Sequence, residues 1–290
     1  MFLCSMVTIA DALKMFDTLS TVYDRQEIDS IKYLVLRDIS NLSKAQLRAF
    51  QDNELSDDVV EKLQNIIAKL QTGEPVQYIL GHTEFYGLPF KVNPSVLIPR
   101  PETEELVEWV LSEVGSRKSE VGNILDIGTG SGCIPITLKK HLPQNQVSGL
   151  DISPTALQTA RQNAQLNNVE VEFIEADILN PNISLLNTKY SVLISNPPYV
   201  TEQEKQDMHQ NVLSHEPHTA LFVPDNDPLL FYRAIADFAL EHLQSNGLLF
   251  FEINENLGKE TVELLATKEF KNIELRQDMS GRDRMIKAEF

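Results

Sequence analysis

After Pro101, short apolar segments alternate with longer segments of helical periodicity, and this alternation restricts the fold of the 290-residue chain more than any other feature. Strands that alternate with helices form a mostly parallel sheet with helices on both faces. An α/β domain is therefore expected over residues 101–290. Its expected strands are 123–127, 146–152, 169–174, 190–195 and 247–253, with a terminal strand pair at 270–277 and 284–290. Its expected helices are 102–114, 133–142, 154–167, 228–243 and 257–266.

Residues 1–75 have helical periodicity and no convincing strand, which predicts a small bundle of four or five short helices. The first helix should begin near Thr8. Ser43 followed by Gln46 is a capping-box sequence, and Ser56 is a second candidate N-cap. Nothing in this segment indicates chemistry, so a separate helical domain with a binding role is expected.

Residues 76–100 have a different composition, in which aromatic and β-branched residues are interrupted by glycines and prolines. This composition predicts short strands or a hairpin that joins the two domains. The pattern alone does not distinguish a linker that packs its aromatic side chains from a segment that faces a substrate.

Net charge, cysteine content and the length of the apolar segments exclude or disfavour several classes of protein. The formal net charge is -17, so the chain as a whole repels phosphate backbones and a dedicated nucleic-acid binder is disfavoured. Two cysteines, Cys4 and Cys133, supply neither a disulfide framework nor a cysteine metal site. No segment has the roughly 18 consecutive apolar residues of a membrane helix. We expect a cytoplasmic protein without a metal.

A glycine-rich loop, Gly128-Thr129-Gly130-Ser131-Gly132, follows the first strand of the α/β region and precedes a helix. Glycines let the backbone turn sharply near a ligand, and the helix N-terminus offers free N–H groups. Asp151 ends the next strand, where its carboxylate can accept hydrogen bonds from ribose hydroxyls. A nucleotide-type site is therefore expected, although Asp151 as a simple helix-capping acid is the alternative.

Three further residues follow or end neighbouring strands. Asp177 and Ile178 could contact an adenine ring, with the carboxylate accepting from the amine, or could belong to a surface turn. Asp126 could line the same pocket or only fix the turn.

The tetrapeptide Asn196-Pro197-Pro198-Tyr199 follows the fourth strand. Two prolines stiffen the loop and remove backbone donors, which leaves carbonyl acceptors. Asn196 adds a side-chain acceptor and Tyr199 an aromatic wall. This group of residues suits a planar NH₂ group, whose hydrogens meet two acceptors while the ring packs on its face. A rigid turn is the structural alternative.

The tetrapeptide is similar to the amino-methyltransferase signature of S-adenosylmethionine-dependent enzymes, which modify adenine or cytosine amines in DNA or glutamine amides in proteins. Three further segments accompany it: VLIPRPETE at 96–104, LDIGTGSG at 125–132 and SGRDR at 280–284. With these motifs, the chain resembles the bacterial release factor glutamine methyltransferase family over nearly its whole length. The resemblance implies a Rossmann-like class I methyltransferase sheet over residues 101–290, preceded by an all-helical domain over 1–75 and a β-hairpin linker over 76–100.

The resemblance also implies a cofactor, S-adenosylmethionine, and a substrate, the glutamine in the Gly-Gly-Gln motif of class I peptide chain release factors. The implied cofactor-binding residues are Gly128, Thr129, Gly130, Ser131, Gly132, Asp151, Asp177, Ile178 and Asn196. The implied substrate-binding residues are Asn196, Pro197, Pro198 and Tyr199, of which Asn196, Pro197 and Tyr199 would be catalytic. The helical domain would dock the release factor. We expect a monomer that engages neither DNA nor a membrane.

Three other functions fit these motifs less well. A DNA amino-methyltransferase acting on adenine shares the tetrapeptide but needs a basic groove, which the acidic composition disfavours. A noncatalytic nucleotide-binding adaptor would not need an intact Asn-Pro-Pro-Tyr. A dinucleotide dehydrogenase is disfavoured because position 133 is Cys, which breaks the usual glycine spacing.

Overall fold

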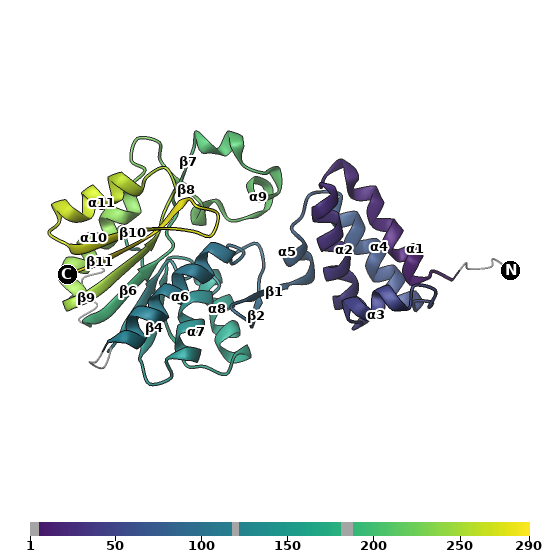
Figure 1. Ribbon diagram of the computed structural model, residues 1–290, viewed down its shortest axis with the longest axis horizontal. Coiled ribbons are helices and arrows are strands. Elements are labelled where there is room, and N and C mark those ends of the chain that lie inside the picture. Colours follow the sequence, from purple (N-terminus) through teal and green to yellow (C-terminus); the bar gives the residue numbers. More distant parts are fainter. Residues whose placement is uncertain (1–5, 118–121, 181–187) are drawn as a thin grey trace. The chain divides into compact units, whose positions relative to one another are not determined.

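The structure is a computed structural model that describes residues 6–117, 122–180 and 188–290. The chain folds into two compact units (Figure 1). One unit comprises Met1–Gly81 and His209–His215, and the other comprises His82–Met208 and Glu216–Phe290. Cys4 lies outside the described residues.

The first unit is helical. Its elements are α1 (Ile9–Met15), η1 (Phe16–Thr21), α2 (Arg25–Ser40), α3 (Lys44–Ala49), α4 (Asp57–Leu70), α5 (Val76–Leu80) and α9 (Gln210–His215). Thr8 caps α1, and the expected capping box of Ser43 and Gln46 is present at α3. Ser56 precedes α4, but its side chain makes no capping hydrogen bond. The amphipathic helices bury Phe16, Leu63 and other apolar side chains in a common core.

Val76–Leu80 is a correction to the expectation of strands over residues 76–100. The segment forms one and a half turns of helix, which end at Gly81 in the left-handed conformation (φ +78°). The helix forms because Val76 is buried in the apolar core of the first unit, where tertiary packing outweighs the β propensity of the sequence. The expected hairpin begins one residue later. It comprises β1 (His82–Phe85) and β2 (Leu88–Lys91), paired antiparallel.

The second unit contains a seven-stranded sheet with the order β10-β11-β9-β6-β3-β4-β5. The strands are β3 (Ile124–Ile127), β4 (Val147–Asp151), β5 (Glu172–Glu175), β6 (Tyr190–Ser195), β9 (Leu243–Glu252), β10 (Lys271–Gln277) and β11 (Asp283–Glu289). Strands β9, β6, β3, β4 and β5 are parallel, whereas β11 runs antiparallel to β9 and β10 antiparallel to β11. The expected parallel sheet and terminal strand pair are thus confirmed.

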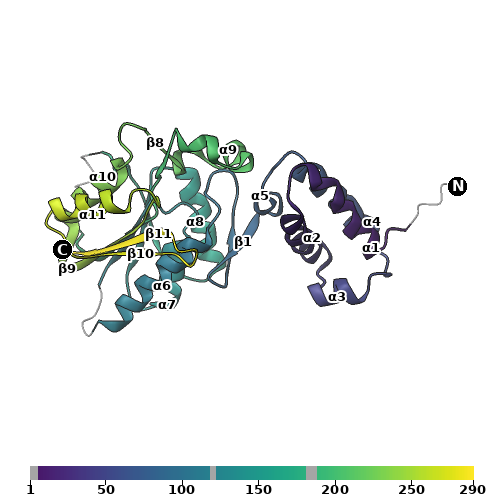
Figure 2. The same cartoon turned by 45° about the horizontal axis from the view of Figure 1, so that its top comes forward.

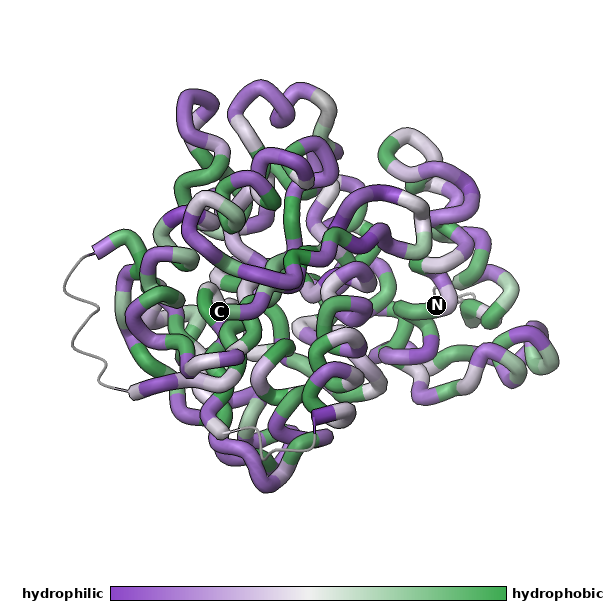
Figure 3. The backbone as a smooth tube through the Cα atoms, turned by 60° about the vertical axis from the view of Figure 1, so that its left-hand side comes forward, coloured by the Kyte–Doolittle hydropathy of each residue, from purple (hydrophilic) through white to green (hydrophobic). Residues whose placement is uncertain are grey.

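Helices cover both faces of this sheet (Figures 1 and 2). Alternate strand residues pack against α6 (Pro101–Ser116), α7 (Cys133–His141) and α8 (Pro154–Leu166) on one face. The intervening residues pack against α10 (Leu230–His242) and α11 (Gly258–Thr267) on the other. Hydrophobic and hydrophilic stretches accordingly alternate along the chain (Figure 3).

Between β6 and α10, residues 196–229 form several short elements that the sequence pattern does not predict. This segment contains β7 (Val200–Thr201), η3 (Glu204–Asp207), α9, η4 (His218–Ala220) and β8 (Phe222–Val223). Strands β7 and β8, near the start and the end of this segment, pair in parallel. Among the described residues, no helix combines the length and hydrophobicity needed to span a membrane.

Candidate active site

The carboxyl ends of the parallel strands place the candidate residues in one row. Ile127 is in register with Leu150 on one side and with Ser195 on the other, and Ser195 is in register with Phe251. The residues that follow these positions are Gly128, Asp151, Asn196 and Glu252. Ligands of open α/β sheets bind at this edge, so the row is the candidate active site.

The glycine-rich loop turns sharply into α7, which places its N–H groups at the same edge. Gly128, Gly130 and Gly132 all have positive φ. A Cβ at Gly132 would lie 3.1 Å from the Cβ of Ala160 in α8, so a side chain there would also separate the two helices. The loop thus needs glycine at Gly132 for both conformation and packing.

Asp151 contacts this loop directly. Its Oδ2 accepts a hydrogen bond from the Gly130 N–H at 2.8 Å, and its Oδ1 accepts from the Ser153 N–H at 2.9 Å. Burial raises the pKa of Asp151, whereas these backbone donors lower it in part. The carboxylate is therefore fixed beside the loop while remaining partly exposed at the edge of the sheet.

Asp126 is a carboxyl group near this edge whose pKa is strongly raised. It is fully buried, and neither of its side-chain oxygens has a hydrogen-bond partner among the described residues. Burial raises its pKa to about 7; the neighbouring Thr129 hydroxyl opposes this rise, and the charge of Asp151 adds to it. Asp126 lies next to Thr129 of the turn and next to Asp151 at the sheet edge, so both alternatives from the sequence, lining the pocket and fixing the turn, stay predictions.

Asp177 and Ile178 lie just beyond β5, whose last residue, Glu175, is in register with Asp151. The Asp177 carboxylate accepts from the Leu179 N–H at 2.9 Å, as in a turn. Ile178 is partly buried against the sheet core. The structure therefore brings both residues to the same edge as Asp151, and the surface-turn alternative remains compatible with the Asp177 hydrogen bond.

The Asn-Pro-Pro-Tyr segment is held by buried polar side chains whose role the sequence does not predict. The Asn196 Nδ2 donates to the Thr103 hydroxyl at 3.1 Å, and this hydroxyl donates to Glu252 Oε2 at 2.6 Å. The Tyr199 hydroxyl donates to the other oxygen, Oε1, of the same carboxylate at 3.1 Å. The Asn254 side chain donates to the Tyr199 carbonyl at 3.1 Å. The segment is thus fixed at both ends.

The sequence gives partial indications of these supporting residues. Glu252 directly follows the apolar run Leu248–Phe251. A charged residue at the end of such a buried strand is expected to have a hydrogen-bond or charged partner. Thr103 lies within the 96–104 motif, but only the folded chain brings it to Asn196. Glu216 is likewise buried, and it binds the Arg100 guanidinium at 2.5 Å and the Ile98 N–H at 3.3 Å. It thereby fixes the 96–104 segment.

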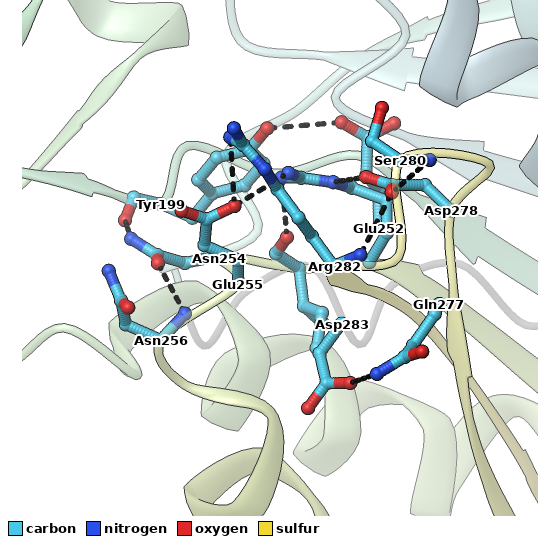
Figure 4. A network of polar contacts seen from close by, with 12 residues as sticks. Tyr199, Glu252, Asn254, Glu255, Asn256, Gln277, Asp278, Ser280, Arg282 and Asp283 are labelled. Atoms are coloured by element: carbon cyan, nitrogen blue, oxygen red, sulfur yellow. Dashed lines mark hydrogen bonds and ion pairs between the residues drawn. The ribbon is translucent and has the colours of Figure 1, made fainter.

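The SGRDR segment forms the turn between β10 and β11, and it reaches the end of β9 beside Glu252 (Figure 4). Asp278 accepts from the backbone N–H groups of Ser280 and Arg282, and its other oxygen accepts from Arg284 Nε at 3.1 Å. These donors lower the pKa of Asp278. The Arg284 guanidinium also donates to the Ile253 carbonyl at 3.2 Å. The motif therefore supports the strand end that carries Glu252.

The Cys133 thiol is poorly suited to act as a nucleophile. Cys133 is buried, and burial raises the pKa of its thiol to about 12. His82, His209 and His218 are exposed, and His215 is half-buried. Within the described ranges, no group of three or more His, Cys, Asp or Glu side chains has an arrangement suited to a metal ion.

Two family descriptions match the chain. Residues 107–221 match the Methyltransferase small domain, and residues 15–81 match the PrmC N-terminal domain. The chain is 49% identical to the release factor glutamine methyltransferase of Flavobacterium psychrophilum over 94% of its own length and 95% of the relative's. It is 41% identical to the enzyme of the same name from Bacteroides thetaiotaomicron, over 93% and 96% of the respective lengths.

The fold of the second unit is shared with solved methyltransferases. The 16S rRNA N2 G1207 methyltransferase of T. thermophilus, solved in complex with AdoMet and guanosine, is 16% identical with a TM-score of 0.50. The match covers 72% of this chain and 49% of that protein. At this identity the likeness shows a common fold, which is the class I methyltransferase fold expected from the sequence.

Proposed function

This chain belongs to the release factor glutamine methyltransferase family, and we propose that it methylates the Gly-Gly-Gln glutamine of class I peptide chain release factors. The methyl group would come from S-adenosylmethionine and go to the side-chain amide nitrogen. The observation that carries this proposal is the Asn196 amide beside the glycine-rich loop, whose Nδ2 donates to Thr103, so that Oδ1 can accept from a ligand.

The residues at the sheet edge fit a cationic nucleotide cofactor. Asp126 is a buried carboxyl without a hydrogen-bond partner among the described residues, and a cation placed near it would compensate its charge. Asp151 would accept from the ribose hydroxyls, and Asp177 with Ile178 would receive the adenine. When bound, S-adenosylmethionine supplies a methyl group activated by a positively charged sulfur. The AdoMet bound to the T. thermophilus enzyme of the same fold supports this assignment.

The Asn-Pro-Pro-Tyr segment would position the substrate. An amide nitrogen is a poor nucleophile, because its lone pair is delocalised into the carbonyl. Asn196 Oδ1 and the Pro197 carbonyl would accept the two hydrogens of the glutamine NH₂ group, while the Tyr199 ring packs on its face. These acceptors would stabilise the positive charge that develops on the nitrogen. The proton released from nitrogen would pass to water, so the proposal requires no general base.

The helical unit would dock the release factor, because it has an apolar core of its own and its described residues include none of the side chains assigned above to the cofactor or the substrate. We expect the enzyme to act as a monomer in the cytoplasm, where translation takes place. DNA is the competing substrate, because the tetrapeptide is shared with DNA amino-methyltransferases.

The test is transfer of a labelled methyl group by the full-length protein to a purified release factor, with adenine-containing duplex DNA offered in parallel. Label in the release factor and none in the DNA is the expected result. Label in the DNA alone would overturn the proposal and favour the alternative activity.

A further inference from the structure

The side chain of Asn196 can adopt two orientations that differ only by exchange of its oxygen and nitrogen, and catalysis as proposed above requires one of them. With Oδ1 toward the substrate, the amide accepts a hydrogen from the glutamine nitrogen. With Nδ2 toward the substrate, two donors would face each other. A group that fixes this orientation would therefore set the rate of methyl transfer.

Thr103 and Glu252 form such a group. Thr103 lies in the first turn of α6 and Glu252 at the end of β9, and their exposed fractions are 3% and 1%. The Thr103 hydroxyl has one hydrogen, which it donates to Glu252 Oε2 at 2.6 Å. An ionised carboxylate can only accept hydrogen bonds. The hydroxyl can then only accept from Asn196, so Nδ2 must face Thr103 at 3.1 Å.

The second oxygen of Glu252 serves the other end of the tetrapeptide, where the Tyr199 hydroxyl donates to Oε1 at 3.1 Å (Figure 4). Burial raises the pKa of Glu252, whereas the hydrogen bonds from Thr103 and Tyr199 and the charge of Arg284 oppose the rise. Among the residues that the structure describes, two hydrogen-bond donors and no acceptor contact this carboxylate, an arrangement that suits its ionised form.

From these contacts we propose that Thr103 and Glu252 are positioning residues, which fix the donor direction at Asn196 and thereby present its oxygen to the substrate amide nitrogen. The inference rests on the proposed function. Neither residue touches the substrate in this account, so both act through Asn196 and Tyr199.

Thr103→Val tests the proposal, because it keeps the side-chain shape and removes the hydroxyl. The amide of Asn196 then loses its fixed orientation, and the single-turnover rate of release-factor methylation should fall on the order of tenfold to a hundredfold. Thr103→Ser keeps the hydroxyl and should stay within roughly threefold of the wild type. The dissociation constant of S-adenosylmethionine, measured by calorimetry, should be unchanged in both variants.

Thr137→Val is the matched control. Thr137 is a buried threonine of α7, and its hydroxyl has no hydrogen-bond partner among the described residues. The same substitution there should leave the methylation rate unchanged. A loss of rate at Thr137 as large as at Thr103 would attribute the effect to packing and overturn the proposal.

A double-mutant cycle with Asn196→Ala separates positioning from general destabilisation. Once Asn196 is removed, Thr103→Val should cause no further loss of rate. Additive losses, or a Thr103→Val enzyme at the wild-type rate, would overturn the inference. Failure of the proposed function has a different signature, in which the wild type itself leaves the release factor unmethylated. If the wild type methylates adenine in DNA instead, the same cycle measured on DNA decides whether Thr103 orients Asn196.

Discussion

The substitution Asp126→Asn offers a test that needs neither cofactor nor substrate, because the raised pKa of the buried carboxyl already makes the stability of the ligand-free protein depend on pH. The ordinary pKa of an aspartate is 3.8, and burial raises that of Asp126 to about 7. Between these values the native protein holds a proton that the unfolded chain has released. Stability therefore falls as the pH rises from about 4 to about 7. The two pKa values correspond to a loss of about 4 kcal/mol from this one group.

The free energy of unfolding should be measured in urea from pH 4 to pH 8 for the wild type and for Asp126→Asn. The other titrating groups are common to both proteins, and any fixed cost of burying the Asn amide is independent of pH. The difference between the two curves should thus change by about 4 kcal/mol across the window, in favour of the variant at high pH. Asp52→Asn, at an exposed carboxylate of the helical unit, is the control and should show no such change. Parallel curves for the wild type and Asp126→Asn would refute the reasoning.

Three further predictions follow from the site. Asp151→Ala should weaken S-adenosylmethionine binding at least about tenfold, because it removes a carboxylate acceptor and also frees the Gly130 N–H; unchanged affinity by calorimetry in a folded variant would remove Asp151 from the site. Asn196→Ala should lower the single-turnover rate by roughly 10²–10³ without loss of fold, whereas Asn196→Asp keeps an acceptor and should retain partial activity; an Ala variant at the wild-type rate would reduce the tetrapeptide to a rigid turn. If the helical unit docks the partner, an intact release factor should have a KM at least about tenfold below that of a short Gly-Gly-Gln peptide, and equal KM values would argue against docking.

Local patterns were sufficient to predict most of the fold. The alternation after Pro101 depends on hydrophobic periods within single elements, and the strand over residues 190–195 has the bounds of β6. The helix start near Thr8 and the Ser43 capping box were also predictable, since the capping box is made by residues only three positions apart.

Tertiary contacts explain what local patterns missed. Residues 76–80 have the composition of a strand, but Val76 is buried in the helical core and the segment is a helix. Residues 209–215 belong to the helical unit although they are far from it in sequence, and no local period shows this.

Some residues of the candidate site could likewise be predicted from local patterns, whereas others depend on tertiary contacts. Gly128–Gly132, Asp151 and Asn196 could be found from the sequence, because each directly follows or ends a predictable strand. Thr103 could not, because its role depends on Glu252, 149 residues away in the chain. The raised pKa of Asp126 likewise could not be predicted, because it depends on complete burial of the carboxyl in the folded chain.

The central claim is that the fixed acceptors of Asn-Pro-Pro-Tyr serve a glutamine amide. The most direct measurement is tandem mass spectrometry of a release factor after incubation with the full-length protein and S-adenosylmethionine. We predict a single methyl group on the side-chain nitrogen of the Gly-Gly-Gln glutamine, and none on a release factor with that glutamine replaced by asparagine. A methyl group on any other residue, or an unmodified factor alongside methylated adenine in DNA, would contradict the account.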